Sequence, residues 1–162
     1  MLEIRLAQET ERESAANIAV EAFVPLKPIL PNGGWQEMSG RVHEVTINKQ
    51  YGPLLLALLD GELVGSVIYN GPGEPENNVF PPDWAYFRAL AVLPAFTRNG
   101  IGRALTGQCI RRAKAEAAQQ IALYTADANT GARNLYLDMG FKQYGEKLKF
   151  FGVSYSKYVL DV

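Results

Sequence analysis

The chain has 162 residues, the usual length of one domain and enough to bury a substantial hydrophobic core. Hydrophobic residues make up 48% and charged residues 20%, which argues against disorder. The net charge of −1 argues against nucleic acid or an anionic membrane as the main partner. Cys109 is the only cysteine, which excludes an intrachain disulfide and a multi-cysteine metal site. No apolar run approaches the ~20 residues of a membrane span and no signal-peptide pattern is present, so we expect a cytoplasmic protein.

The first fifty residues predict one strand and two helices. Residues 3–6 alternate polar and apolar side chains, as a half-buried strand does. Thr10 and Glu13 have the spacing of a capping box, and apolar residues recur behind them at helical intervals. Residues 24–34 hold three prolines and two glycines and predict a loop, and a second helix is expected from Trp35 to about Lys49.

The next segment changes to the pattern of strands. Leu54–Leu59 is a continuous apolar run, Asp60-Gly61 is a hairpin turn signal, and Glu62–Tyr69 supplies the returning strand. Residues 70–82 are rich in Gly, Pro and Asn and predict a long connection of the kind that often carries function. Trp84–Leu93 is aromatic and branched, which predicts a strand buried on both faces.

The second half of the chain predicts a helix, a strand, a helix and two final strands. The helices are expected over about Gly100–Ala118 and Asn129–Met139, with the strand Ile121–Thr125 between them. Gly140 is placed to end the second helix in the left-handed conformation, and the last two strands are expected around Phe151-Gly152. The whole pattern predicts one α/β domain over residues 1–162, with a mixed sheet and no repeats or linker.

The turn between the central strand and the helix after it contains two closely spaced glycines. The first N–H groups of a helix have no partner within the helix, and its dipole favours an anion there. Gly100 and Gly102 remove side chains that would block a large anion, and Arg98 and Arg103 flank them. The loop therefore predicts a phosphate or pyrophosphate site at residues 98–103. It lacks the lysine of a P-loop and the third glycine of the dinucleotide fingerprint, and a turn that binds nothing remains the alternative.

Val92-Leu93-Pro94, followed by residues 98–105, resembles the acetyl-CoA-binding motif of the GNAT superfamily of N-acetyltransferases. That motif reads [QR]-x-x-G-x-[GA], and the chain departs from it at Thr97, where Gln or Arg stands in the family. The resemblance implies that main-chain groups of the central strand bind the pantetheine arm and that the loop binds the pyrophosphate. The implied residues are Leu90, Ala91 and Val92 for the arm, and Arg98, Asn99, Gly100, Ile101, Gly102 and Arg103 for the pyrophosphate.

Residues 129–141 resemble a second GNAT signature, N-x-x-A-x-x-L-Y-x-x-x-G-F. Asn129 and Tyr136 are seven residues apart and so lie on one face of a helix. An amide near the helix start can bond the pantetheine arm, and the phenol of Tyr136 can act as the general acid for the leaving thiolate. The N–H near Val92 can stabilise the developing oxyanion. The alternatives are that Asn129 only caps the helix and that Tyr136 only packs in the core.

The general base stays open at this level. An incoming ammonium must lose a proton, usually to a carboxylate or through water. His43 is the only histidine and is interpreted as a surface or helix-edge residue, and Cys109 as a buried structural thiol. The candidates by position are Asp83, Tyr86, Tyr124, Glu37 and Glu44.

The resemblance implies the GNAT fold, a mixed twisted sheet of six to seven strands with about four helices that splits near the central strand. It implies acetyl-CoA as co-substrate, no metal, and direct transfer to an amine in a ternary complex. The default acceptor is a small-molecule amine bound among the helices and the 24–34 and 70–82 loops, with a peptide amine left open, and homodimers are common in such enzymes. The alternatives are a non-catalytic acyl-CoA-binding regulatory domain and a small nucleotide-binding module.

Overall fold

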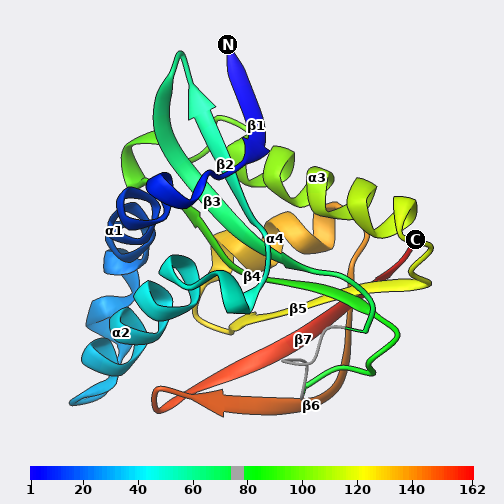
Figure 1. Cartoon of the computed structure of the whole chain (residues 1–162). Helices are drawn as coiled ribbons and strands as arrows, with labels where there is room; N and C mark the ends of the chain where they lie inside the picture. The colour runs from blue at the N-terminus through cyan, green and yellow to red at the C-terminus, as the bar shows by residue number, and fades with distance from the viewer. Residues whose placement is uncertain (74–78) are drawn as a thin grey trace.

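The computed structural model describes residues 1–73 and 79–162, and within them the chain forms one seven-stranded sheet. The strands lie in the order β1-β2-β3-β4-β5-β7-β6 (Figure 1). All neighbouring pairs are antiparallel except β4 and β5, which are parallel. The strand bounds are β1 Leu2–Leu6, β2 Leu54–Leu59, β3 Glu62–Asn70, β4 Ala85–Val92, β5 Gln120–Ala126, β6 Lys142–Phe150 and β7 Val153–Asp161.

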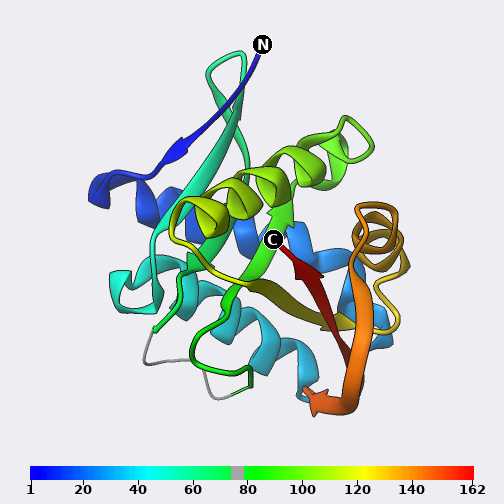
Figure 2. The same cartoon turned by 90° about the vertical axis from the view of Figure 1, so that its right-hand side faces the viewer.

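Four α-helices within the described residues cover the two faces of the sheet. They are α1 Arg12–Phe23, α2 Gly34–Ile47, α3 Ile101–Ala115 and α4 Thr130–Asp138. The helices α1 and α2 lie on one face, and α3 and α4 lie on the other, as the two perpendicular views show (Figures 1 and 2). This arrangement has the mixed, twisted sheet of seven strands and the four helices that the GNAT resemblance implies.

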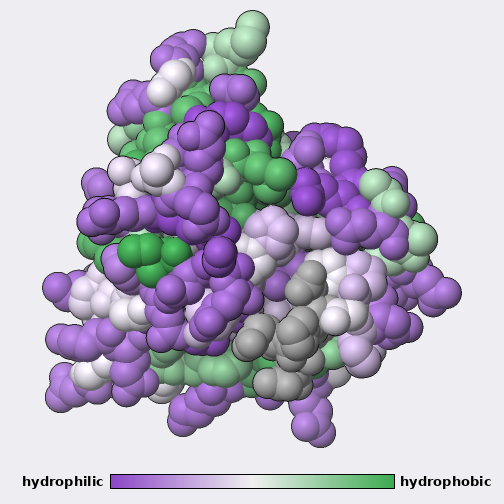
Figure 3. All heavy atoms as spheres, in the orientation of Figure 1, coloured by the Kyte–Doolittle hydropathy of each residue, from purple (hydrophilic) through white to green (hydrophobic). Residues whose placement is uncertain are grey.

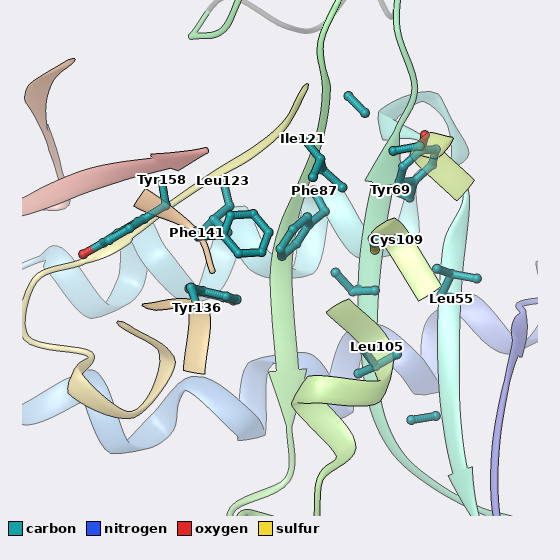
Figure 4. Close-up of a cluster of buried hydrophobic side chains, with 14 of the residues drawn as sticks. Leu55, Tyr69, Phe87, Leu105, Cys109, Ile121, Leu123, Tyr136, Phe141 and Tyr158 are labelled. Carbon is teal, nitrogen blue, oxygen red and sulfur yellow. The ribbon is translucent and has the colours of Figure 1, made fainter. Parts of the chain in front are cut away.

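The largest hydrophobic core lies between the sheet and α3, and it reaches α4 (Figure 4). From α3 it takes Ile101, Leu105, Cys109 and Ala113, and from α4 it takes Tyr136. On the other face, the alanines Ala15, Ala16 and Ala19 of α1 are completely buried. Such small side chains let a helix lie close to its neighbours, so this face of the sheet is covered tightly.

Most of the sequence predictions for individual elements agree with the structure. The Asp60-Gly61 and Phe151-Gly152 turns have positive φ at both residues, as two-residue hairpins require. Gly140 ends α4 with a φ of 97°, and the Phe141 N–H donates to the Tyr136 carbonyl oxygen at 3.0 Å.

Three local predictions were wrong in detail. The capping box is formed by Gln8 and Glu11 rather than Thr10 and Glu13, because a short 3₁₀ turn precedes α1. The expected loop after α1 contains a 3₁₀ helix over Val24–Ile29. The helix α3 stops at Ala115, because Ala117 adopts the left-handed conformation and the Ala118 N–H closes the end on the Ala113 carbonyl.

The expected long connection over residues 70–82 is described at its two ends only, and residues 74–78 lie outside the described residues. On the face seen in Figure 3, hydrophilic residues cover most of the surface and hydrophobic ones form separate patches. No helix within residues 1–73 and 79–162 is long and apolar enough to cross a membrane.

Candidate active site

The sheet splits along the seam between β4 and β5. The two strands pair only at Ala85 with Ile121 and at Tyr86 with Ala122, whereas β4 continues to pair with β3 as far as Val92. Beyond Tyr86 the edge of β4 that faces β5 therefore has no strand partner. Two pockets open along this edge, an inner one of about 200 Å³ and an outer one of about 790 Å³.

A β-bulge in β4 lies at the split. The strand register moves from Ile68 opposite Arg88 to Ser66 opposite Ala91, so Ala89 and Leu90 have no partner in the β3–β4 ladder. Ala89 has a φ of 53°, the left-handed conformation that a bulge can require. The sequence carries no signal for this bulge, because alanine is not a residue that favours positive φ.

The bulge determines which main-chain groups of β4 remain available. The Leu93 N–H donates to the Val64 carbonyl oxygen at 2.9 Å. Alternation along an antiparallel strand then directs the main chain of Ala91 toward β3 and that of Val92 toward the open edge. Three residues were expected to bind a pantetheine arm. Of these, Leu90 and Val92 have main-chain groups that the β3–β4 pairing leaves unused.

Tyr136, on α4, lines the inner pocket, and only 3% of it is exposed. Its ring contacts those of Phe87, Phe141 and Tyr158, with centroid distances of 5.8, 5.8 and 6.4 Å (Figure 4). Burial raises the pKa of its phenol well above the ordinary value. Tyr136 is therefore both a core residue and a protonated hydroxyl at the edge of a cavity.

Asn129 occupies the N-cap of α4, where its Oδ1 accepts from the Ala132 N–H at 3.4 Å. The capping role considered from the sequence is therefore present. Asn129 also lines both the inner and the outer pocket, as do Leu90 and Ala132. Its amide nitrogen makes no hydrogen bond within the described residues, so capping through Oδ1 leaves the donor side of this residue available.

The glycine loop forms one wall of the outer pocket. Gly100 is the N-cap of α3 with a φ of 76°, and its missing side chain leaves the first N–H groups of the helix without a side-chain partner. The N-terminal end of a 15-residue helix therefore opens into this pocket. The loop residues that line it are Arg98, Gly100, Ile101, Gly102 and Arg103.

The side chains of the loop have separate tasks. Arg103 forms an ion pair with Asp138 of α4, and Arg98 lines the outer pocket without an ion pair in the described residues. Asn99 is exposed and donates from Nδ2 to the Phe96 carbonyl oxygen at 3.1 Å, so it supports the loop and lines neither pocket. A Cβ at Gly102 would lie 3.2 Å from Leu135 Cδ2, which shows that this glycine also lets α3 and α4 pack closely.

Tyr124 is the one candidate general base from the sequence that lines the inner pocket. Glu44 instead accepts hydrogen bonds from Arg41 and Tyr51, both at 2.6 Å. Asp83 and Glu37 are exposed, and neither they nor Tyr86 lines a pocket. No carboxylate lines the inner pocket among the residues that the structure describes.

The remaining reactive side chains lie away from the split. Cys109 is buried in α3 and burial raises the pKa of its thiol, so it is not a nucleophile. His43 is half-buried on α2 and lines neither pocket. In the described part of the chain, no three His, Cys, Asp or Glu side chains lie close enough to hold a metal ion.

Solved acetyltransferases share the overall fold of this chain. PaiA N-acetyltransferase from Thermoplasma acidophilum, in complex with coenzyme A, is 17% identical with a TM-score of 0.75, covering 100% of this chain and 99% of that one. YncA from Salmonella typhimurium, with its cofactor acetyl-CoA, is 17% identical with a TM-score of 0.71 over 99% and 93%. The ribosomal-protein-S18-alanine N-acetyltransferase from Escherichia coli is 19% identical with a TM-score of 0.70 over 99% and 94%.

The sequence profile of the acetyltransferase (GNAT) family matches residues 15–141. The chain therefore belongs to this family. No curated protein matches its sequence. At the identities given above, the likeness to the solved structures shows the fold alone.

Proposed function

We propose that the protein is an acetyl-CoA-dependent N-acetyltransferase that acetylates a small amine by direct attack within a ternary complex. The observation that carries this proposal is that the two pockets adjoin and share the lining residues Phe23, Leu26, Leu90, Asn129 and Ala132. An open helix N-terminus suited to a diphosphate is thereby connected to a chamber that holds a buried phenol. One long molecule with a phosphate end and a reactive end, such as acetyl-CoA, suits this arrangement.

The outer pocket holds the diphosphate in this proposal. The free N–H groups at the start of α3 donate to its oxygens, and the helix dipole adds a favourable field. Arg98 adds a charge-assisted contact from the rim. Arg103 keeps its ion pair with Asp138 and so orders the wall on which the diphosphate rests. The pantetheine arm then runs along the open edge of β4, pairing with the main chain of Leu90 and Val92.

The chemistry takes place in the inner pocket. The amine nitrogen forms a bond to the acetyl carbonyl carbon, the carbon–sulfur bond breaks, and the electron pair leaves with sulfur. The Tyr136 hydroxyl donates a hydrogen bond to that sulfur as negative charge develops. A phenol is ordinarily a weaker acid than a thiol, and burial raises the pKa of Tyr136 further, so the hydroxyl stays protonated and is available as a donor to the sulfur.

The pocket linings favour a different oxyanion donor from the N–H near Val92 that the sequence suggested. Val92 lines only the outer pocket, whereas Leu90 lines both pockets and has no partner in the strand ladder. We therefore assign the developing oxyanion to the N–H of Leu90, beside the bulge. The proton released by the amine leaves through pocket water or through the Tyr124 hydroxyl, which lines the same chamber.

The size of the inner pocket favours a small acceptor. Its volume of about 200 Å³ lies below the roughly 300–1,000 Å³ of pockets for drug-sized ligands. A peptide amine is the second acceptor class that we consider, because the ribosomal-protein-S18-alanine N-acetyltransferase is among the similar structures.

We also propose that residues 1–162 act as one domain in a reducing compartment such as the cytoplasm, with a buried free thiol at Cys109.

A non-catalytic acyl-CoA-binding domain is the second candidate, because no carboxylate lines the inner pocket within the described residues. Calorimetry with CoA, acetyl-CoA and ATP tests the binding step. We expect CoA and acetyl-CoA to bind, ATP to compete weakly, and Gly102→Trp to bind neither thiol nor thioester. Release of CoA thiol with a panel of amines then separates the two candidates. Tight binding without release for any amine would support the non-catalytic domain, and absence of CoA binding would remove both.

A further inference from the structure

Two arginines face the inner pocket, Arg41 from α2 and Arg88 from β4. Both guanidinium groups lie over the ring of Tyr51, at 5.0 and 5.1 Å from its centroid. The described residues that line this pocket include no Asp or Glu. The chamber in which the amine must bind therefore has a cationic side, which is unexpected if the acceptor is recognised only as an ammonium ion.

The two arginines differ in their partners. Arg41 donates to Glu44 Oε1 at 2.6 Å, so its charge is balanced on the protein. Arg88 forms no ion pair within residues 1–73 and 79–162, and its Nε is buried without an acceptor. Its one hydrogen bond is long, from Nη2 to the Tyr51 carbonyl oxygen at 3.5 Å. A half-buried guanidinium with most of its five donors unused is costly in a free protein and suited to an incoming anion.

The diphosphate of acetyl-CoA is not that anion if the proposed function holds. The diphosphate site is in the outer pocket, which Arg88 does not line. Arg88 packs on Tyr51, which belongs to the cluster formed with Ala15 of α1 and Val45 of α2. Tyr136 approaches the split from the opposite face of the sheet, within the cluster that contains α3. The anion that Arg88 would bind therefore belongs to the second substrate, which enters from the side of α1 and α2.

The rest of the inner pocket is apolar and rich in aromatic rings. Tyr124, Phe150 and Tyr155 pack on one another with centroid distances of 5.1, 5.2 and 5.9 Å. Met38 and Phe151 complete this side of the chamber. An acceptor that meets these surfaces carries an apolar or aromatic group as well as an anionic one.

We propose that the acceptor is a small amine that also carries a carboxylate and an apolar side chain, that is, a free α-amino acid of the apolar or aromatic kind. This inference rests on the proposed function. The carboxylate pairs with the Arg88 guanidinium, the side chain lies against Tyr124 and Phe150, and the amine faces Leu90. In the reaction the amine nitrogen gains the acetyl group and loses one proton, sulfur leaves and is protonated, and the carboxylate stays unchanged.

A matched series of acceptors tests the carboxylate directly. The series is L-phenylalanine, L-phenylalaninamide and phenethylamine, compared at equal concentrations of unprotonated amine, with CoA thiol release as the rate and mass spectrometry for the product. We expect kcat/KM for phenylalanine to exceed that of both analogues without a carboxylate by on the order of 10- to 100-fold, because a charge-assisted hydrogen bond is lost in each. Equal or faster acetylation of the amide or the amine overturns the proposal and leaves acetyl transfer itself intact.

The variant Arg88→Gln locates the effect. We expect it to remove the preference for phenylalanine over phenethylamine while the affinity for CoA in calorimetry and the melting temperature stay unchanged. Arg111→Gln is the matched control, and we expect it to keep the preference. Arg111 is exposed on α3 and, among the described residues, hydrogen-bonds Gln108 alone. A preference that persists in Arg88→Gln overturns the proposal. If the unmodified protein does not bind CoA at all, the proposed function and this inference are refuted together.

Discussion

Replacing Tyr136 by phenylalanine removes a single oxygen from the site. The ring contacts with Phe87, Phe141 and Tyr158 stay in place. The hydroxyl has no hydrogen bond with the described residues, so its loss leaves no described partner unsatisfied. We therefore expect the free energy of unfolding of Tyr136→Phe to change by less than about 1 kcal/mol.

The effect on turnover is much larger. A hydrogen bond to a group that becomes charged contributes about 1.5–3 kcal/mol. At about 1.4 kcal/mol for each factor of ten in rate, kcat falls roughly 10- to 150-fold. The affinity for CoA stays within a factor of about 2, because the bond to sulfur forms mainly as the thiolate leaves.

The assay is CoA thiol release at saturating acetyl-CoA, with calorimetry for CoA and urea unfolding for stability. Tyr158→Phe is the matched control, because Tyr158 is buried against Tyr136 but lines neither pocket. It removes the same atom from the same cluster and keeps kcat. Full activity of Tyr136→Phe with several amines would refute the role of the phenol. An equal fall in both variants would show that packing, and not donation to sulfur, sets the rate.

Two further predictions concern stability and reactivity. Asp127 accepts hydrogen bonds from Lys147 and Ser156, which hold the pKa of its carboxyl below the usual range. Because the pKa of Asp127 is lower in the folded state than in the unfolded state, its ionised carboxylate stabilises the fold when the pH is above the unfolded-state pKa. This contribution is lost as the pH falls through the folded-state pKa. Asp127→Asn should thus lose about 1 kcal/mol or less at pH 7 in urea unfolding, and the difference should shrink below about pH 4. The Cys109 thiol should react with a disulfide reagent only as fast as the chain unfolds, and rapid labelling in native buffer would contradict its burial.

The parts of the site that the sequence predicted depend on residues close together in the chain. The glycine loop and the N-terminal residues of α3 lie within six positions, and their free N–H groups follow from the backbone of any helix start. Asn129 and Tyr136 are seven residues apart, at the N-cap and near the end of α4, and both line the inner pocket. Helical periodicity and turn chemistry are local properties, so a single sequence is enough to place these groups relative to one another.

The sequence alone determined the order of the elements, the mixed sheet and the two motifs, because periodicity, glycine turns and caps act over a few residues. It did not determine the bulge at Ala89, where the strand ladder with β3 forces a conformation that alanine does not favour. Nor did it bring Arg41 and Arg88 together on one pocket wall, since they lie far apart in the chain. Only the tertiary structure decides such contacts, because they depend on how β4 and β5 diverge and on how α2 packs across the opening.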